Sequence, residues 1–98
     1  MFVVLLRFAA HKDQAPQHMS AHNAWLRQGF DEGVFLLAGS LAPGAGGAIL
    51  AAHCSAEALE ARIAQDPFVV AGVVAPEVVA ITPGRTDPRL AFLAQASA

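Results

Sequence analysis

The sequence predicts a small α+β protein of the ferredoxin-like kind, with the element order β-α-β-β-α-β. Four short runs of consecutive apolar residues, rich in β-branched and aromatic types, are typical of buried strands. Two longer segments lie between them, and their apolar residues recur at helical spacing. A chain of 98 residues has room for one domain of this size.

The first half of the chain is predicted to hold a strand, a helix and a second strand. Residues 2–8 form a continuous apolar run, which indicates a strand that is buried on both faces. Pro16 suits the first turn of the following helix, and Gly33 suits its end. The inner face of that helix is marked by apolar spacing at Met19, His22, Leu26 and Phe30, with Trp25 beside it. Residues 34–38 should form the second strand, ending at Gly39 and Ser40.

The second half of the chain is predicted to continue with a hairpin, a helix and a last strand. The loop 41–47, LAPGAGG, should join the second strand to a third at residues 48–53. Ser55 is a good N-cap for the second helix, whose inner face carries Leu59 and Ile63. This helix must end near Asp66, because Pro67 disfavours a helical residue before it. Residues 78–81 should form the fourth strand, and a short helix is expected after Asp87-Pro88.

Composition and strand pattern together predict a homodimer. The chain is 55% apolar and 14% charged, more apolar than a small monomer needs, although its alanines inflate the first figure. The ferredoxin-like fold places both helices on one face of the sheet. The strands nevertheless show no alternation of apolar and polar residues, so something should also cover the second face. A second copy of the sheet is the simplest cover.

Several classes of partner and location are disfavoured. The net charge is −2 and the six basic residues are scattered, which argues against nucleic acid. No apolar run approaches the ~18–20 residues of a membrane span, and the apolar N-terminus lacks the basic start of a signal peptide. Cys54 is the single cysteine, and it is expected to be a small buried hydrophobe and not a nucleophile. A cytoplasmic location fits these features.

A set of short segments, taken in order along the chain, resembles a known family. They are MFVVLLRF at the start, His22-x-x-Trp25-Leu26, Gly33-Val34-Phe35-Leu36, Ala38-Gly39-Ser40, Pro43 with Gly46-Gly47, and Asp66-Pro67-Phe68 followed by Gly72. Together they resemble the YCII-related (YciI-like) family over roughly residues 1–83. Residues 84–98 are then a C-terminal tail without a clear counterpart in the family.

The resemblance implies a dimeric α/β barrel, in which two ferredoxin-like sheets pack face to face. It also implies an active site built on a His–Asp pair, which carries over to His22 and Asp66, with Ser40 as a neighbour. One branch of the family removes chloride from a chlorinated hydroxyquinol. Because this fold hosts many chemistries, the resemblance does not identify a substrate.

The residues themselves give two readings of His22 and Asp66. A polar residue on the apolar stripe must find a partner or line a cavity, so His22 is either a general acid–base or a core-edge histidine bonded to a carbonyl. Asp66 is explained by capping before Pro67 alone, but its second oxygen could also orient a histidine. We expect the two side chains to be in contact.

Four further residues are candidates for substrate binding: Ser40, Arg7, Trp25 and Phe68. Arg7 is the lone charge of the first strand, and it either holds a substrate anion or ends the buried section. The aromatic residues are expected to form a pocket wall. His18 and His22 have the i, i+4 spacing of metal ligands, but no further ligands complete a motif, so we expect no metal. The PGAGG loop lacks the Lys-Ser/Thr of a phosphate-binding loop, and no organic cofactor is expected.

Two functions remain open from the sequence. The first is a cofactor-independent lyase or isomerase that acts on a small, aromatic or enol-forming molecule, with His22 moving the proton and Asp66 orienting it. The second is a non-catalytic module that binds a small ligand or a protein, which the shortage of polar candidates favours. Convergence of those candidates on one pocket would favour the enzyme.

Overall fold

The computed structural model describes residues 1–95 and has the predicted element order. The strands are β1 (Phe2–Phe8), β2 (Phe35–Leu41), β3 (Gly46–Ala51) and β4 (Val74–Ala80). The helices are α1 (Ala15–Asp31), α2 (Ala56–Ile63) and the single turn α3 (Pro67–Val70), and short 3-10 helices span Lys12–Gln14 and Pro88–Gln95. The expected C-terminal helix is therefore of the 3-10 type, and residues 96–98 of the predicted tail lie outside the described residues.

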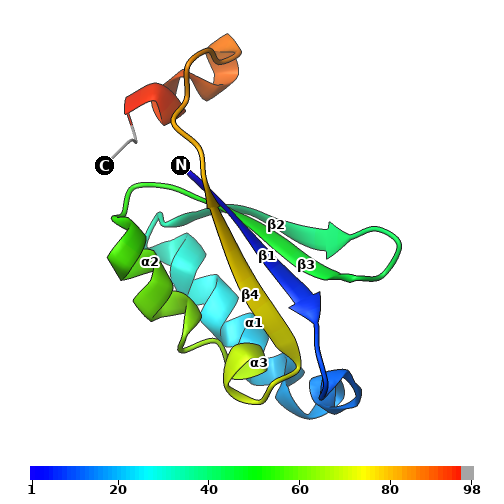
Figure 1. The fold of residues 1–98 in the computed structure, drawn as a ribbon. Coiled ribbons are helices and arrows are strands. Elements are labelled where there is room, and N and C mark those ends of the chain that lie inside the picture. The colour runs from blue at the N-terminus through cyan, green and yellow to red at the C-terminus, as the bar shows by residue number, and fades with distance from the viewer. Residues whose placement is uncertain (96–98) are drawn as a thin grey trace.

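The strands of the described residues form a four-stranded sheet in the order β2-β3-β1-β4, with every neighbouring pair antiparallel. Helices α1, α2 and α3 lie on one side of this sheet, while the β2–β3 hairpin extends away from them (Figure 1). Gly47 of β3 pairs with Leu6 of β1 on one side and with Ser40 of β2 on the other. The α+β, ferredoxin-like fold predicted from the sequence is confirmed.

The core lies between the sheet and the helices. Phe2, Val4 and Leu6 alternate along β1 and are buried beneath the helices, while Val3 and Leu5 between them are half-buried on the other face. This alternation follows from the pleat, which sends successive side chains to opposite faces. Both sets are apolar, so the sequence pattern alone could not show which set faces the helices.

Helix α1 buries a different stripe from the one predicted. His22 is buried as expected, but its buried companions are Trp25 and Gly29, while Met19 and Phe30 are 44% and 42% exposed. The reason is a close approach between the helix and β2. The Phe35 ring lies where a side chain at Gly29 would stand, because a Cβ added there would be 2.1 Å from the ring. The missing side chain turns the Gly29 face of the helix, and not the Phe30 face, toward the sheet.

The ends of the helices follow the predicted capping chemistry. Gly33 follows α1 with φ of +75°, a left-handed conformation that glycine adopts without the steric cost of a side chain. The Ser55 hydroxyl caps α2 by accepting a hydrogen bond from the Ala58 amide at 3.1 Å. Asp66 caps α3 in the same way, through the Phe68 amide.

Three strands have bounds that differ from those predicted. Strand β2 runs to Leu41 and includes Gly39 and Ser40, which were expected to end it, because both pair with β3 in the hairpin. Strand β3 correspondingly begins at Gly46. Strand β4 begins at Val74 and passes through Pro76, which an edge strand tolerates because one side of its backbone has no strand partner.

The face of the sheet away from the helices is open and mostly apolar, with Arg7 and Glu77 at one end. We call it the open face: Val3 and Leu5 of β1, Leu37 of β2, Leu50 of β3 and Val79 of β4 lie on it. Leu37 is 57% exposed and Val79 is 40% exposed. The C-terminal segment stands beyond one end of the sheet, close to the N-terminus (Figure 1), where its Leu93 is buried against Ala52.

Candidate active site around His22 and Asp66

His22 lies within α1 and is buried beneath two aromatic rings. Its imidazole stacks on the ring of Phe68, with 4.0 Å between centroids and 7° between planes. The Trp25 ring, one turn further along the helix, lies 5.7 Å from it. Trp25 is in turn fixed by a hydrogen bond from its Nε1 to the Arg62 carbonyl at 3.0 Å. These contacts hold the imidazole in one orientation.

Asp66 is fully buried and approaches His22 from the link between α2 and α3. Its Oδ1 lies 2.7 Å from His22 Nδ1 and accepts a hydrogen bond from the Phe68 amide at 3.0 Å. The contact expected between the two side chains is therefore present. The sequence predicted that one carboxylate oxygen of Asp66 would accept the capping hydrogen bond and the other would orient the histidine. In the structure, Oδ1 takes part in both hydrogen bonds.

His22 Nδ1 and Asp66 Oδ1 share one hydrogen bond. An ionised carboxylate only accepts hydrogen bonds, so His22 Nδ1 is the donor when Asp66 is ionised. Within residues 1–95, His22 Nε2 has no hydrogen-bond partner, and Asp66 Oδ2 is buried without one. Nε2 is thus the nitrogen that is free to exchange a proton with a ligand.

A pocket of about 330 Å³ lies in front of His22, between α1, α3 and the sheet. Among residues 1–95, its polar side chains are few, namely His22, Asn23 and Ser40, and no charged Asp, Glu, Lys or Arg lines it. The remaining lining residues are apolar or glycine: Leu6, Phe8, Met19, Leu26, Ala38, Gly39, Gly46, Gly47, Ala48, Ile49, Phe68 and Val74. Apolar walls with a few convergent polar groups are typical of small-molecule sites.

A family model for the YCII-related domain matches residues 1–83. The chain belongs to the YCII-related family. Among solved structures, the fold is similar to that of 5-chloro-2-hydroxyhydroquinone dehydrochlorinase from Burkholderia phenoliruptrix, solved in complex with 2,5-dihydroxybenzoquinone. The TM-score is 0.69 and the sequence identity 18%, with 86% of this chain and 96% of that chain covered. A search of curated proteins found no match.

Three of the residues selected from the sequence line one pocket in this YCII-related domain. His22 enters from α1, Phe68 from α3, and Ser40 from the end of β2. Asp66 stands behind His22 and reaches the pocket only through it. Trp25 does not line the pocket. It packs on His22 and helps to fix the orientation of the imidazole.

Arg7 lies apart from these residues. It pairs with Ala75 and Gly46 in the sheet register, on the open face and not on the helix face, and its guanidinium forms an ion pair with Glu77. Arg7 does not line the His22 pocket. The alternative given for it, that it ends the buried section of β1, agrees with this position, since the preceding residue Leu6 is buried.

The sequence reasoning missed Asn23 and Gly47 as pocket residues. Asn23 follows His22 in α1 and is exposed at the pocket, where its amide could donate or accept a hydrogen bond. Gly47 lies on the sheet side of the pocket, whereas the sequence analysis assigned it to the hairpin loop and to the segments that resemble the family. In the sequence, the only indication that Asn23 could line the pocket was its position next to His22. Gly47 could be placed at the pocket only once the strand register was known.

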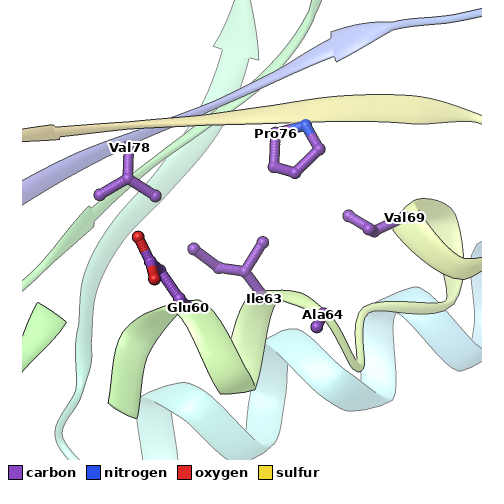
Figure 2. Close-up of a pocket in the computed structure, with 6 residues that line it drawn as sticks. All are labelled: Glu60, Ile63, Ala64, Val69, Pro76 and Val78. Atoms are coloured by element: carbon purple, nitrogen blue, oxygen red, sulfur yellow. The ribbon is translucent and has the colours of Figure 1, made fainter. Parts of the chain in front are cut away.

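A second recess of about 320 Å³ lies between α2, α3 and the edge strand β4 (Figure 2). It is lined by Glu60, Ile63, Ala64, Val69, Pro76 and Val78, and none of the selected site residues belongs to it. In the described part of the chain, no three His, Cys, Asp or Glu side chains gather in a way that could hold a metal ion. No helix there is long and apolar enough to cross a membrane.

Proposed function

We propose that this YCII-related protein is a cofactor-independent enzyme that carries out proton transfer of the lyase or isomerase type on a small molecule. The observation that carries the proposal is the 2.7 Å contact between buried Asp66 and His22 beside an apolar pocket. A histidine held by a carboxylate at one nitrogen, with the other nitrogen open to a pocket, is the arrangement of a general acid–base.

The proposed reaction begins with His22 Nε2 taking a proton from an acidic C–H or O–H bond of the substrate. The imidazolium that forms is stabilised by the carboxylate of Asp66, which stays ionised and accepts the Nδ1 hydrogen bond throughout. The electron pair left on the substrate either expels a leaving group, as in a lyase, or moves along the conjugated system, as in an isomerase. In the isomerase the proton returns from Nε2 to a different atom of the substrate.

The pocket favours a small ring or enol-forming molecule as the substrate. Its walls are apolar and aromatic, and in the described part of the chain no charged side chain other than a protonated His22 would meet the ligand. The Ser40 hydroxyl stands on β2 on the sheet side of the pocket, where it can donate a hydrogen bond to a substrate oxygen. The dehydrochlorinase of similar fold, bound to a dihydroxybenzoquinone, supports this substrate class.

The proposal includes a homodimer formed through the open face. Leu37 and Val79 on that face are exposed, and an apolar sheet face of this kind is typical of a surface covered by another subunit. It also includes a cytoplasmic location, since the described residues hold one cysteine, Cys54, which is free.

The alternative is a non-catalytic domain that binds a small ligand in the same pocket. The observation that favours it is the small number of polar lining groups, namely His22, Asn23 and Ser40. In that case the imidazole would act only as a hydrogen-bond partner for the ligand.

The test begins with a search for ligands among small cyclic enols, phenols and quinones, read as a rise in melting temperature. Each hit is then incubated with the protein in D2O, and NMR follows deuterium exchange, isomerisation or loss of a leaving group. Turnover that is abolished by His22→Asn, with binding retained, supports the enzyme. Binding without any exchange or turnover, for every hit, supports the binding domain and contradicts the enzyme.

A further inference from the structure

Two adjacent glycines, Gly46 and Gly47, line the sheet side of the His22 pocket, and only one of them is required by the backbone conformation. Gly46 has φ of +135°, and a Cβ at this position would lie 2.0 Å from the Leu6 carbonyl oxygen, so the backbone requires glycine. Gly47 has no such requirement. Its φ lies outside the left-handed region, and an added Cβ would meet a single atom within 4 Å, the Gly39 carbonyl oxygen at 3.3 Å.

The register shows where a side chain at Gly47 would project. Gly47 pairs with Leu6 and with Ser40, and residues directly opposite in neighbouring strands share a face. Leu6 is buried beneath the helices, so the Cβ of a residue at position 47 would point to the helix side, into the pocket that His22 lines from α1.

We propose that Gly47 is a specificity-determining residue whose missing side chain keeps room for a substrate ring between β3 and His22. This inference rests on the proposed function, and it states in addition which residue sets the size of the substrate that the pocket can accept. A glycine inside a strand weakens the strand, and here the backbone conformation does not call for it, although an added Cβ would require the Gly39 carbonyl oxygen to move by a few tenths of an ångström. An apolar cavity of ~150 Å³ holds benzene, so the pocket of about 330 Å³ has space for one substituted ring. The proposed substrate class is a single-ring molecule with hydrogen-bonding substituents that can reach His22 and Ser40.

The first experiment compares the two glycines by thermal melting of the full chain. Gly47→Ala should change the melting temperature by less than about 4 °C, because the movement needed to relieve the Gly39 contact is small. Gly46→Ala should lower it by more than that, because its Cβ would overlap the β1 backbone. If Gly47→Ala lowers the melting temperature as much as Gly46→Ala does, Gly47 is a structural glycine and the proposal is wrong.

The second experiment attaches a ring at position 47 and reads its effect on His22. In a Cys54→Ala background, the thiol of Gly47→Cys is treated with benzyl methanethiosulfonate. The thiolate attacks the reagent sulfur, a disulfide forms and methanesulfinate leaves. The imidazole ¹⁵N resonances of His22 should then shift. The matched control is Gly84→Cys, outside the sheet, where an added Cβ meets nothing within 4 Å. Unshifted His22 resonances, or equal shifts in both variants, would overturn the proposal.

The third experiment uses 2,5-dihydroxybenzoquinone as a ligand and measures its affinity by titration calorimetry. Gly47→Val should weaken binding at least tenfold while Gly84→Val leaves it unchanged. Tight binding retained in Gly47→Val contradicts the Gly47 proposal. A wild-type protein that does not bind the quinone removes support from the proposed function, while the tethered ring still decides the role of Gly47.

Discussion

Asp66 and His22 are joined through a carboxylate oxygen that is also the cap of α3. Oδ1 accepts the His22 Nδ1 hydrogen bond at 2.7 Å and the Phe68 amide hydrogen bond at 3.0 Å, while Oδ2 is buried without a partner among residues 1–95. The cap therefore fixes the position of the oxygen that orients the imidazole. Phe68 contributes twice, because its ring also stacks on His22.

Replacement of His22 should remove activity. We expect His22→Ala to lower turnover by ~10²–10⁴, the usual contribution of a positioned acid–base group. The same variant leaves Asp66 Oδ1 buried without one of its two hydrogen-bond partners, which should lower the free energy of unfolding by ~1–3 kcal/mol. Turnover is measured with the ligands that the thermal-shift search identifies. The free energy of unfolding is measured by urea unfolding.

His22→Asn separates these two effects. Its side-chain amide can donate a hydrogen bond to Asp66 from near the position of Nδ1, but it has no equivalent of Nε2. We expect activity as low as in His22→Ala with a smaller loss of stability. A rate in His22→Asn close to that of the wild type would mean that His22 is not the acid–base group.

Replacement of Asp66 should distinguish a cap from a catalytic partner. We expect Asp66→Asn to lower turnover by less than His22→Ala does. Its amide group would place N–H donors where Oδ2 now has no partner, which costs ~1–3 kcal/mol of stability. If Asp66 were a cap alone, Asn would leave the rate almost unchanged, because Asn caps nearly as well and the buried N–H donors would lower stability alone.

A charge among the apolar residues of the open face should disrupt the proposed homodimer. Val79→Glu would place a carboxylate within the buried interface, so we expect a monomer at micromolar concentration by light scattering. The matched control is Val70→Glu, because Val70 is 73% exposed and lies on α3, on the other side of the sheet. A wild-type protein that is already monomeric would contradict the dimer, as would a Val79→Glu variant that stays dimeric.

The Cys54 thiol should react slowly with alkylating reagents near neutral pH. Partial burial raises the pKa of Cys54, while the charges of Arg62 and the N-terminus oppose this shift in part. The thiolate is the reactive form, and a raised pKa lowers its fraction at a given pH. We expect the rate of alkylation by iodoacetamide to rise with a midpoint above the ~8.5 of a free cysteine. The same thiol in the urea-unfolded protein should react faster at pH 7.5, and equal rates would contradict the expectation.

Local chemistry accounts for the features that the sequence predicted well. The apolar runs, the caps at Ser55 and Asp66 and the stop at Gly33 each depend on neighbouring residues, and so the order of elements could be derived from them. His22 could be selected because a polar residue on an apolar stripe must find a partner. The contact with Asp66, 44 positions along the chain, was implied by the resemblance to the family, and both helices on one face of the sheet allow the two residues to meet.

Features that depend on distances between elements were decided by the tertiary structure. The buried face of α1 includes Trp25 and Gly29, and not the predicted Met19 and Phe30, because the Phe35 ring occupies the space beside Gly29. The separation of Arg7 from the pocket follows from strand register, since a residue and its neighbour in a strand point to opposite faces. In this protein the sequence by itself determined the order of the elements and the selection of His22 and Asp66. The packing of helices on the sheet decided which side chains share a pocket, because that depends on contacts between residues far apart in the chain.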